Sequence, residues 1–213
     1  MIDIIKNFQN IKSSINSSNV NIIAVSKTFS FDKIKPLIDF GHLHYGENKV
    51  QEAKAKWFKV KNEISNLQLH MIGKLQSNKA KEAVELFDFI HSVDSEKLAT
   101  TLARYENLLN KKRKYFIQVN IGNENQKSGL RIEQLVDFYF FCKEKSLNII
   151  GLMCIPPNVK NSKKYFIELA KLNKFLNLKQ ISMGMSADYL EAIQCGSTFV
   201  RIGSAIFGNR IIK

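Results

Sequence analysis

Short apolar runs alternate with longer amphipathic stretches along nearly the whole chain. The runs are rich in β-branched residues and end at turn-forming residues, a pattern that predicts buried strands. They cover residues 21–28, 43–47, 68–73, 89–93, 115–121, 149–155, 180–183 and 198–202. The stretches between them carry apolar side chains at helical spacing and predict helices. These cover residues 2–16, 30–40, 49–61, 78–87, 95–110, 132–145, 162–176 and 186–195, with a short helix or turn after Gly203.

This alternation predicts an α/β protein built on a parallel sheet. Parallel strands joined through helices need right-handed crossovers, and eight such units can close on themselves as a (β/α)8 TIM barrel. An open, doubly wound sheet is the alternative, which the count of eight disfavours. We expect residues 1–213 to form a single barrel domain, in which the helix over residues 2–16 is an extra N-terminal element.

Composition bears on the partners of the protein. The formal net charge is +13, which suggests an anionic partner. However, only five of the 32 basic residues are arginine, the residue favoured for contacts with bases and phosphates. The lysines are spread over nearly every predicted helix, and the cluster at residues 111–114 is typical of a solvated turn. We therefore expect compositional bias rather than nucleic-acid binding.

The cysteines, histidines and apolar segments argue against several further classes of protein. Cys142, Cys154 and Cys195 are odd in number and far apart, so we expect buried thiols in a reducing compartment. The histidines lack a metal-binding spacing, and we expect no metal site. No apolar run is long enough to cross a bilayer, and the N-terminus lacks the apolar segment of a signal peptide. We expect a cytoplasmic protein with no membrane association.

The first candidate for chemistry is Lys27, which closely follows the apolar run Ile22–Val25. In a barrel it lies at the carboxyl ends of the strands, where such proteins carry their sites. A lysine that loses hydration has a lowered pKa, and its neutral amine attacks carbonyl groups to form a Schiff base. The alternative is a solvent-exposed lysine that merely closes the strand.

The loops after the last two predicted strands are candidates for a phosphate site, because TIM barrels often bind phosphate there. Gly184 and Gly203 would let the backbone approach an anion, and Ser186 and Ser204 would each supply a hydroxyl donor. Ser186 is equally typical of a helix N-cap, and Gly203 with Ser204 of a plain turn. The two loops together favour a phosphate cradle.

A reactive lysine combined with a phosphate cradle suits pyridoxal 5'-phosphate, because its aldehyde condenses with an amine while its phosphate is bound elsewhere. Arg201 could then donate to the pyridine nitrogen, which would keep that nitrogen unprotonated and weaken the cofactor as an electron sink. A structural ion pair at a strand end is the other explanation for Arg201. Lys127, in the polar loop after residues 115–121, is a second candidate lysine, with ordinary exposure as its alternative.

Seven sequence blocks, spread in order over nearly the whole chain, carry a resemblance to a known family. They are Ala24–Thr28, Tyr45–Asn48 with Val50–Glu52, Ile72–Gly73 with Leu75–Lys79, Lys127–Gly129, Gly151–Met153, Met183–Ser186 and Val200–Gly208. In these blocks the chain resembles the pyridoxal phosphate homeostasis protein family, also called the YggS/PROSC family.

The resemblance implies both a fold and a site. The fold is the fold type III barrel found as the N-terminal domain of alanine racemase, and it binds pyridoxal 5'-phosphate as a lysine aldimine. The matching residues are Lys27, Asn48, Met185, Ser186, Arg201, Gly203 and Ser204. Lys27 would form the aldimine and Arg201 would face the pyridine nitrogen. The two serines and Gly203 would contact the phosphate, and the remaining two residues would line the pocket.

The family is regarded as carriers and regulators in vitamin B6 homeostasis, with no established reaction. The resemblance therefore implies that the protein has no catalytic residue. It also implies that the partners are apo-enzymes that depend on pyridoxal phosphate. We expect the protein to be a monomer. The alternative is a racemase-like enzyme acting on amino acids. In alanine racemases a tyrosine from a second domain lies opposite the lysine and acts as the second base, whereas we expect this sequence to end as its barrel closes. Tyr45 or a partner subunit would have to supply the second base.

Overall fold

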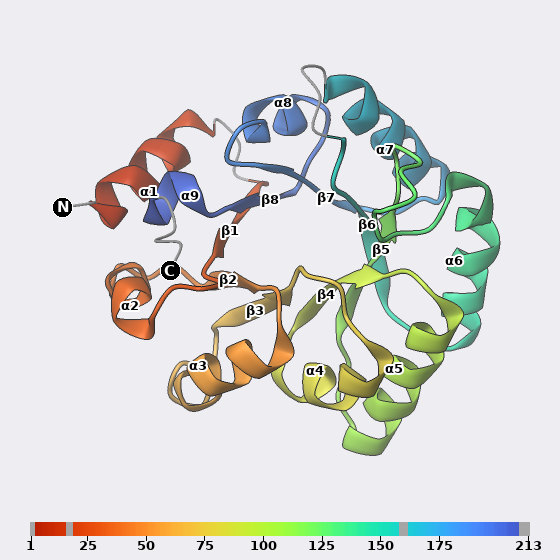
Figure 1. The fold of residues 1–213 in the computed structure, drawn as a ribbon, viewed down its shortest axis with the longest axis horizontal. Helices are drawn as coiled ribbons and strands as arrows, with labels where there is room; N and C mark the ends of the chain where they lie inside the picture. Colours follow the sequence, from red (N-terminus) through yellow and green to blue (C-terminus); the bar gives the residue numbers. More distant parts are fainter. Residues whose placement is uncertain (1–2, 16–18, 158–161, 209–213) are drawn as a thin grey trace.

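Eight parallel strands close into a barrel surrounded by helices in the computed structural model, which describes residues 3–15, 19–157 and 162–208 (Figure 1). Each strand pairs with its neighbours in sequence, and β1 pairs with β8 to complete the ring. The strands are β1 Asn21–Val25, β2 His44–Glu47, β3 Gln68–Met71, β4 Phe89–Val93, β5 Lys114–Val119, β6 Ile149–Cys154, β7 Gln180–Met185 and β8 Phe199–Ile202. The predicted TIM barrel is confirmed, and the open sheet is wrong.

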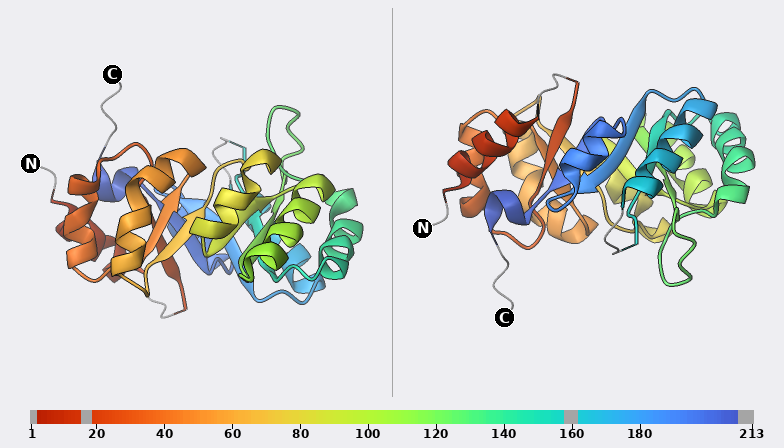
Figure 2. Two further views of the ribbon diagram at one scale, coloured as in Figure 1. Left: turned by 90° about the horizontal axis from the view of Figure 1, so that it is seen from below. Right: turned by 90° about the horizontal axis from the view of Figure 1, so that it is seen from above.

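The helices of the described residues lie on the outside of the ring (Figures 1 and 2). They are α1 Ile4–Ser14, α2 Phe31–Asp39, α3 Val50–Glu63, α4 Ala80–Leu86, α5 Glu96–Leu109, α6 Leu135–Glu144, α7 Lys163–Phe175, α8 Tyr189–Gln194 and α9 Ser204–Phe207, with 3-10 helices η1 Ser77–Lys79 and η2 Ile132–Gln134. Among these, no helix is both long enough and apolar enough to span a membrane.

Capping residues explain where several helices begin and end. Asp3 accepts a hydrogen bond from the Lys6 N–H at 2.9 Å and caps the start of α1. The predicted ends of this helix, residues 2 and 16, lie outside the described residues. Ser95 caps α5 and accepts a hydrogen bond from the Leu98 N–H. Gly41 follows α2 with φ +92°, a left-handed conformation that glycine adopts without strain, so the predicted helix end is confirmed.

The segment around Ser186 differs from the prediction. β7 extends to Met185 rather than ending at Met183, and α8 begins at Tyr189 with Asp188 as its N-cap. Ser186 is therefore not an N-cap, and its hydroxyl is available for another role. That role depends on the loop after β8.

The strands bury two different faces, because alternate residues point to opposite sides of a barrel sheet. Outward-facing residues such as Ala24, Leu69 and Val200 pack with the helices in the main core. A separate buried cluster fills the barrel interior and consists of Ile23, Phe89, Phe116, Met153 and Phe199. This layer packs the barrel interior, so the barrel is not an open pore.

The extra N-terminal helix is confirmed and packs beside the last helix. α1 lies next to α9 outside β1 and β8 (Figures 1 and 2). Asn7 Nδ2 of α1 donates to the Ile206 carbonyl of α9 at 3.1 Å, and Phe8 packs edge-on against Phe40. α1 thus covers the closing strand pair of the barrel.

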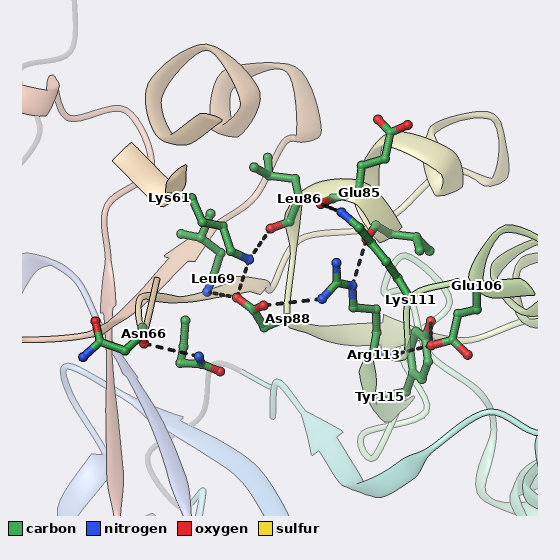
Figure 3. A network of polar contacts seen from close by, with 12 residues as sticks. Lys61, Asn66, Leu69, Glu85, Leu86, Asp88, Glu106, Lys111, Arg113 and Tyr115 are labelled. Carbon is green, nitrogen blue, oxygen red and sulfur yellow. Dashed lines mark hydrogen bonds and ion pairs between the residues drawn. The ribbon is translucent and has the colours of Figure 1, made fainter. Parts of the chain in front are cut away.

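The basic cluster at residues 111–114 is not simply a solvated turn, contrary to the sequence prediction. The Arg113 side chain is mostly buried, and its Nη1 lies 3.5 Å from Asp88 Oδ1 (Figure 3). Lys61 of α3 donates to the other oxygen of Asp88 at 2.6 Å, and the Arg113 N–H donates to the buried Glu106. Arg113 therefore connects α5 with Asp88, just before β4, and Asp88 is also bound by Lys61 of α3.

The expectation that all three thiols are buried holds for two of them. Cys142 and Cys154 are buried, whereas Cys195 is half-buried. Burial raises the pKa of Cys142 and Cys154 to about 12, so both are protonated at neutral pH. These two residues behave as small apolar side chains.

Candidate functional site

A cavity of about 330 Å³ opens at the carboxyl ends of the strands. Its lining includes the residues that the sequence motifs select, namely Lys27, Asn48, Met185, Ser186, Arg201, Gly203 and Ser204. Apolar walls come from Val25, Phe29, Ile72 and Ile155. A volume of this size lies at the lower end of the ~300–1,000 Å³ typical of cofactor sites. The barrel therefore brings all of the predicted site residues around one space.

A second hollow, of about 470 Å³, lies at the opposite end of the barrel beside α1. Phe8, Lys12, His42 and His44 are among its lining residues, and none of the predicted site residues is. TIM-barrel proteins carry their chemistry at the carboxyl ends of the strands. We therefore take the smaller cavity as the candidate site.

Lys27 reaches the cavity from a tight turn after β1. Ser26 is fully buried, and its N–H donates to the Gly46 carbonyl at 3.0 Å. Thr28 follows with φ +68°, so the chain turns sharply at Lys27. The Lys27 side chain is half-buried and lines the cavity. This position favours a role in the cavity over a lysine that only closes a strand toward solvent.

A buried carboxylate anchors this turn to the neighbouring helix. Oε1 of Glu47 accepts from Ser26 Oγ at 2.7 Å, from Lys56 Nζ at 2.9 Å and from Trp57 Nε1 at 2.9 Å. Lys56 also donates to the Ser26 carbonyl at 2.8 Å. The other oxygen, Oε2, has no hydrogen-bond partner among the described residues. Glu47 thus fixes the backbone that presents Lys27.

Glu47 ends the predicted strand over residues 43–47, but its partners are not evident from the sequence. A usable signal was Trp57, which lies on the apolar face of a predicted helix and carries an indole N–H that needs an acceptor when buried. The acceptor is supplied by the end of the preceding strand.

Arg201 projects from β8 into the base of the cavity and is only 4% exposed. Its Nη1 donates to the carbonyl and the hydroxyl of Ser182, both at 2.8 Å, and its Nη2 donates to the Cys154 carbonyl at 2.8 Å. None of the ion pairs found among the described residues includes Arg201, which argues against the structural ion-pair explanation. Burial lowers the pKa of Arg201.

Ser186 links the two loops of the predicted phosphate cradle. Its Oγ accepts from the backbone N–H groups of Gly203 and Ala205, each at 3.4 Å. The loops after β7 and β8 therefore lie side by side, and the exposed hydroxyl of Ser204 lies on the same rim. Hydroxyls and nearby backbone N–H groups are the donors that a phosphate requires.

Asn48 enters the cavity because the chain after β2 passes very close to Gly73. A Cβ on Gly73 would lie 2.3 Å from the Asn48 carbonyl oxygen and 2.7 Å from its Cα. Only glycine permits this approach, so Gly73 sets the position of the Asn48 backbone.

Two further candidates from the sequence lie outside the cavity. Lys127 donates to the Pro156 carbonyl at 2.9 Å and pairs with Glu124 in the loop after β5. Tyr45 faces outward from β2 and packs on Trp57 with ring centroids 4.8 Å apart. Burial raises the pKa of Tyr45, whose hydroxyl has no partner among the described residues. The suggestion that Tyr45 supplies a second base is therefore wrong for this structure.

The groups around the cavity fit pyridoxal 5'-phosphate chemically. An amine is present for the aldehyde at Lys27, hydroxyls for the phosphate at Ser186 and Ser204, and a guanidinium for the ring nitrogen at Arg201. Apolar side chains cover the space between these polar groups, as a planar aromatic ring requires.

Comparison with known proteins agrees with this set of groups. Residues 2–210 match the family described as alanine racemase, N-terminal domain. The pyridoxal phosphate homeostasis protein of Vibrio cholerae is 38% identical over 204 residues, which cover 91% of this chain and 86% of the relative. The protein of the same name from Escherichia coli is 37% identical over 202 residues, which cover 90% and 86%.

Solved structures extend the comparison. PipY of Synechococcus elongatus, determined with PLP bound, has a TM-score of 0.88 at 33% identity and covers 97% of this chain and 100% of that one. An alanine racemase of Clostridium difficile has a TM-score of 0.75, and the match covers 99% of this chain and 57% of the racemase chain. Because the identity is only 14%, this likeness shows the fold alone. The chain belongs to the pyridoxal phosphate homeostasis protein family, whose barrel is that of the N-terminal domain of alanine racemase.

Proposed function

We propose that this protein binds pyridoxal 5'-phosphate and acts in its homeostasis as a carrier and regulator. The observation that carries the proposal is the gathering of an amine, two hydroxyls and a buried guanidinium around one cavity at the carboxyl ends of the strands. The names of the relatives, and the PLP in the PipY structure, support it.

Each group has a role in holding the cofactor. Lys27 is the covalent attachment point, because a lysine amine condenses with the aldehyde. Ser186, Ser204 and the Gly203 backbone bind the phosphate, and Arg201 donates to the ring nitrogen. Asn48 and Met185 line the pocket beside the ring. When bound, the cofactor supplies an electron sink, which an arginine at the ring nitrogen weakens.

Carrier function is favoured over catalysis by what the cavity lacks. Among the described residues that line it, only Lys27 and Arg201 are titratable. Racemisation of an amino acid needs a proton donor and an acceptor on opposite faces of the substrate, and a guanidinium is a poor base. We further propose that residues 1–213 act as one domain, as a cytoplasmic monomer that exchanges cofactor with apo-enzymes.

Covalent labelling of Lys27 tests the binding site. Protein loaded with pyridoxal 5'-phosphate and reduced with borohydride should carry the label on the peptide containing Lys27. Lys27→Ala should lose the label and the visible band of the bound cofactor, whereas Lys127→Ala, the matched control from the loop after β5, should keep both. A label that persists in Lys27→Ala would place the attachment point elsewhere.

Isotope exchange tests the carrier function. Loaded protein incubated in deuterium oxide with L- or D-amino acids should exchange the Cα proton no faster than free pyridoxal 5'-phosphate does. Exchange that is orders of magnitude faster would favour the racemase-like alternative, because protein-assisted proton transfer typically contributes about 10²–10⁴-fold.

A further inference from the structure

A line of hydrogen-bonded side chains crosses the barrel interior and ends on Arg201. It starts at His44, the first residue of β2, whose Nδ1 lies 3.0 Å from Nε2 of His70 on β3. Nδ1 of His70 lies 3.0 Å from Nε2 of His91 on β4. Nδ1 of His91 lies 2.9 Å from Ser182 Oγ on β7, which accepts from Arg201 Nη1 at 2.8 Å. The line connects the hollow at the amino ends of the strands with the cavity at their carboxyl ends.

Aromatic packing holds the two central rings in place. The His70 ring stacks on Phe89 with centroids 4.3 Å apart and an interplanar angle of 11°. The His91 ring stacks on Phe116 at 4.2 Å and 18°. Both histidines are fully buried. Their nitrogens are therefore directed along the line rather than toward a common point.

One arrangement of protons satisfies every group in the line. A guanidinium only donates, so Ser182 Oγ accepts from Arg201, and the hydroxyl proton has one described acceptor, Nδ1 of His91. Neutral His91 then carries its proton on Nε2 and donates to His70, which donates in the same way to His44. Burial lowers the pKa of each of these three histidines, which agrees with neutral rings.

Arg201 needs such support because it is a buried cation. Burying a charge is costly unless polar groups compensate for the lost water. The compensating groups are the carbonyls of Cys154 and Ser182 and the Ser182 hydroxyl. Hydrogen bonds that all point the same way polarise one another. In this line every donor points away from Arg201, which makes the Ser182 oxygen a stronger acceptor for the guanidinium.

We propose that Ser182, His91, His70 and His44 are positioning residues that stabilise the Arg201 guanidinium and hold it at the base of the cavity. The consequence for the cofactor rests on the proposed function, since Arg201 faces the ring nitrogen only if pyridoxal 5'-phosphate binds there. The line itself requires no cofactor, so it can be tested in the unloaded protein.

Nitrogen-15 NMR of the histidine rings tests the direction of the line without cofactor. At neutral pH, His44, His70 and His91 should each be neutral with the proton on Nε2. In Ser182→Ala the ring signals of His91 and the side-chain N–H signals of Arg201 should shift, and the latter should exchange faster with water. A proton on Nδ1 of His91, a charged ring in the line, or Arg201 signals that do not change would overturn the inference.

Binding of pyridoxal 5'-phosphate tests the consequence for the site, with Ser92→Ala as the matched control. Ser92 lies next to His91 and is also buried, but its hydroxyl has no partner among the described residues. Ser182→Ala should bind about tenfold more weakly, as expected for the loss of one hydrogen bond to a charged group, whereas Ser92→Ala should stay within about twofold. Equal affinities of the two variants would contradict the positioning role. If the unsubstituted protein bound no cofactor, the proposed function would fail, and the NMR result would still decide the line.

Discussion

Acidification below pH 6.5 should destabilise this protein steeply, because its four histidines are held neutral in the folded state. The pKa of His42 is lowered to about 4, mainly by burial and then by the neighbouring His44. Burial also lowers the pKa of His44, and lowers those of His70 and His91 well below 6.5. In the unfolded chain all four titrate near 6.5, so below that pH the unfolded state binds protons that the folded state does not. The free energy of unfolding therefore falls as the pH falls.

The expected slope is large. Each histidine that stays neutral contributes about 1.4 kcal/mol per pH unit, so four contribute up to about 5 kcal/mol per unit. A typical domain stability of about 5–15 kcal/mol is then offset within roughly one to three units. Asp94 acts in the opposite direction, because burial raises its pKa and the folded state takes up its proton first. One such group cannot balance four histidines.

Urea unfolding at several pH values between 5 and 8 measures this slope. Stability should be nearly constant above pH 7, where the histidines are neutral in both states. His42→Gln, which keeps a side-chain donor for the His44 carbonyl, should reduce the slope near pH 5.5 by about 1.4 kcal/mol per unit. A stability that is the same at pH 7 and pH 5 would show that the histidines are protonated in the folded protein.

The histidines also illustrate what the sequence could not predict. His44, His70 and His91 are more than twenty residues apart from one another, and no spacing rule for metal sites or helices links them. They meet because β2, β3 and β4 are adjacent parallel strands in which each of the three side chains points inward. The strands themselves follow from local apolar patterns, whereas the stagger between strands depends on closure of the whole barrel. The elements can therefore be predicted from the sequence, whereas this contact cannot.

The site was predictable to a greater extent, because it depends on topology rather than on exact register. The carboxyl ends of parallel strands all lie at one end of a barrel, so Lys27 after β1 and the glycine and serine residues after β7 and β8 had to approach one another. The contacts of Ser186 could not be predicted in the same way. β7 continues through Gly184, which has φ +89°, so the helix begins later and Ser186 contacts the backbone of the next loop instead.

The second large effect is expected from Glu47→Ala, which should lower the free energy of unfolding by about 3–5 kcal/mol. The substitution removes the acceptor of three donors at once, from Ser26, Lys56 and Trp57. The side chains of Glu47 and Lys56 are 0% and 12% exposed, so water does not readily replace the lost contacts. Glu47→Gln should cost less, because its amide oxygen still accepts a hydrogen bond.

The matched control for Glu47→Ala is Glu52→Ala, on the same stretch of chain. Glu52 pairs with Lys49, but their side chains are 40% and 70% exposed, and such surface pairs contribute at most about 0.5–1 kcal/mol. Urea unfolding at pH 7 measures both variants. Because Glu47 also holds the turn at Ser26, Glu47→Ala should slow borohydride-trapped labelling of Lys27 under conditions where the protein remains folded, and Glu52→Ala should not. If the two variants lost the same stability, the buried carboxylate would not be what anchors the turn that presents Lys27.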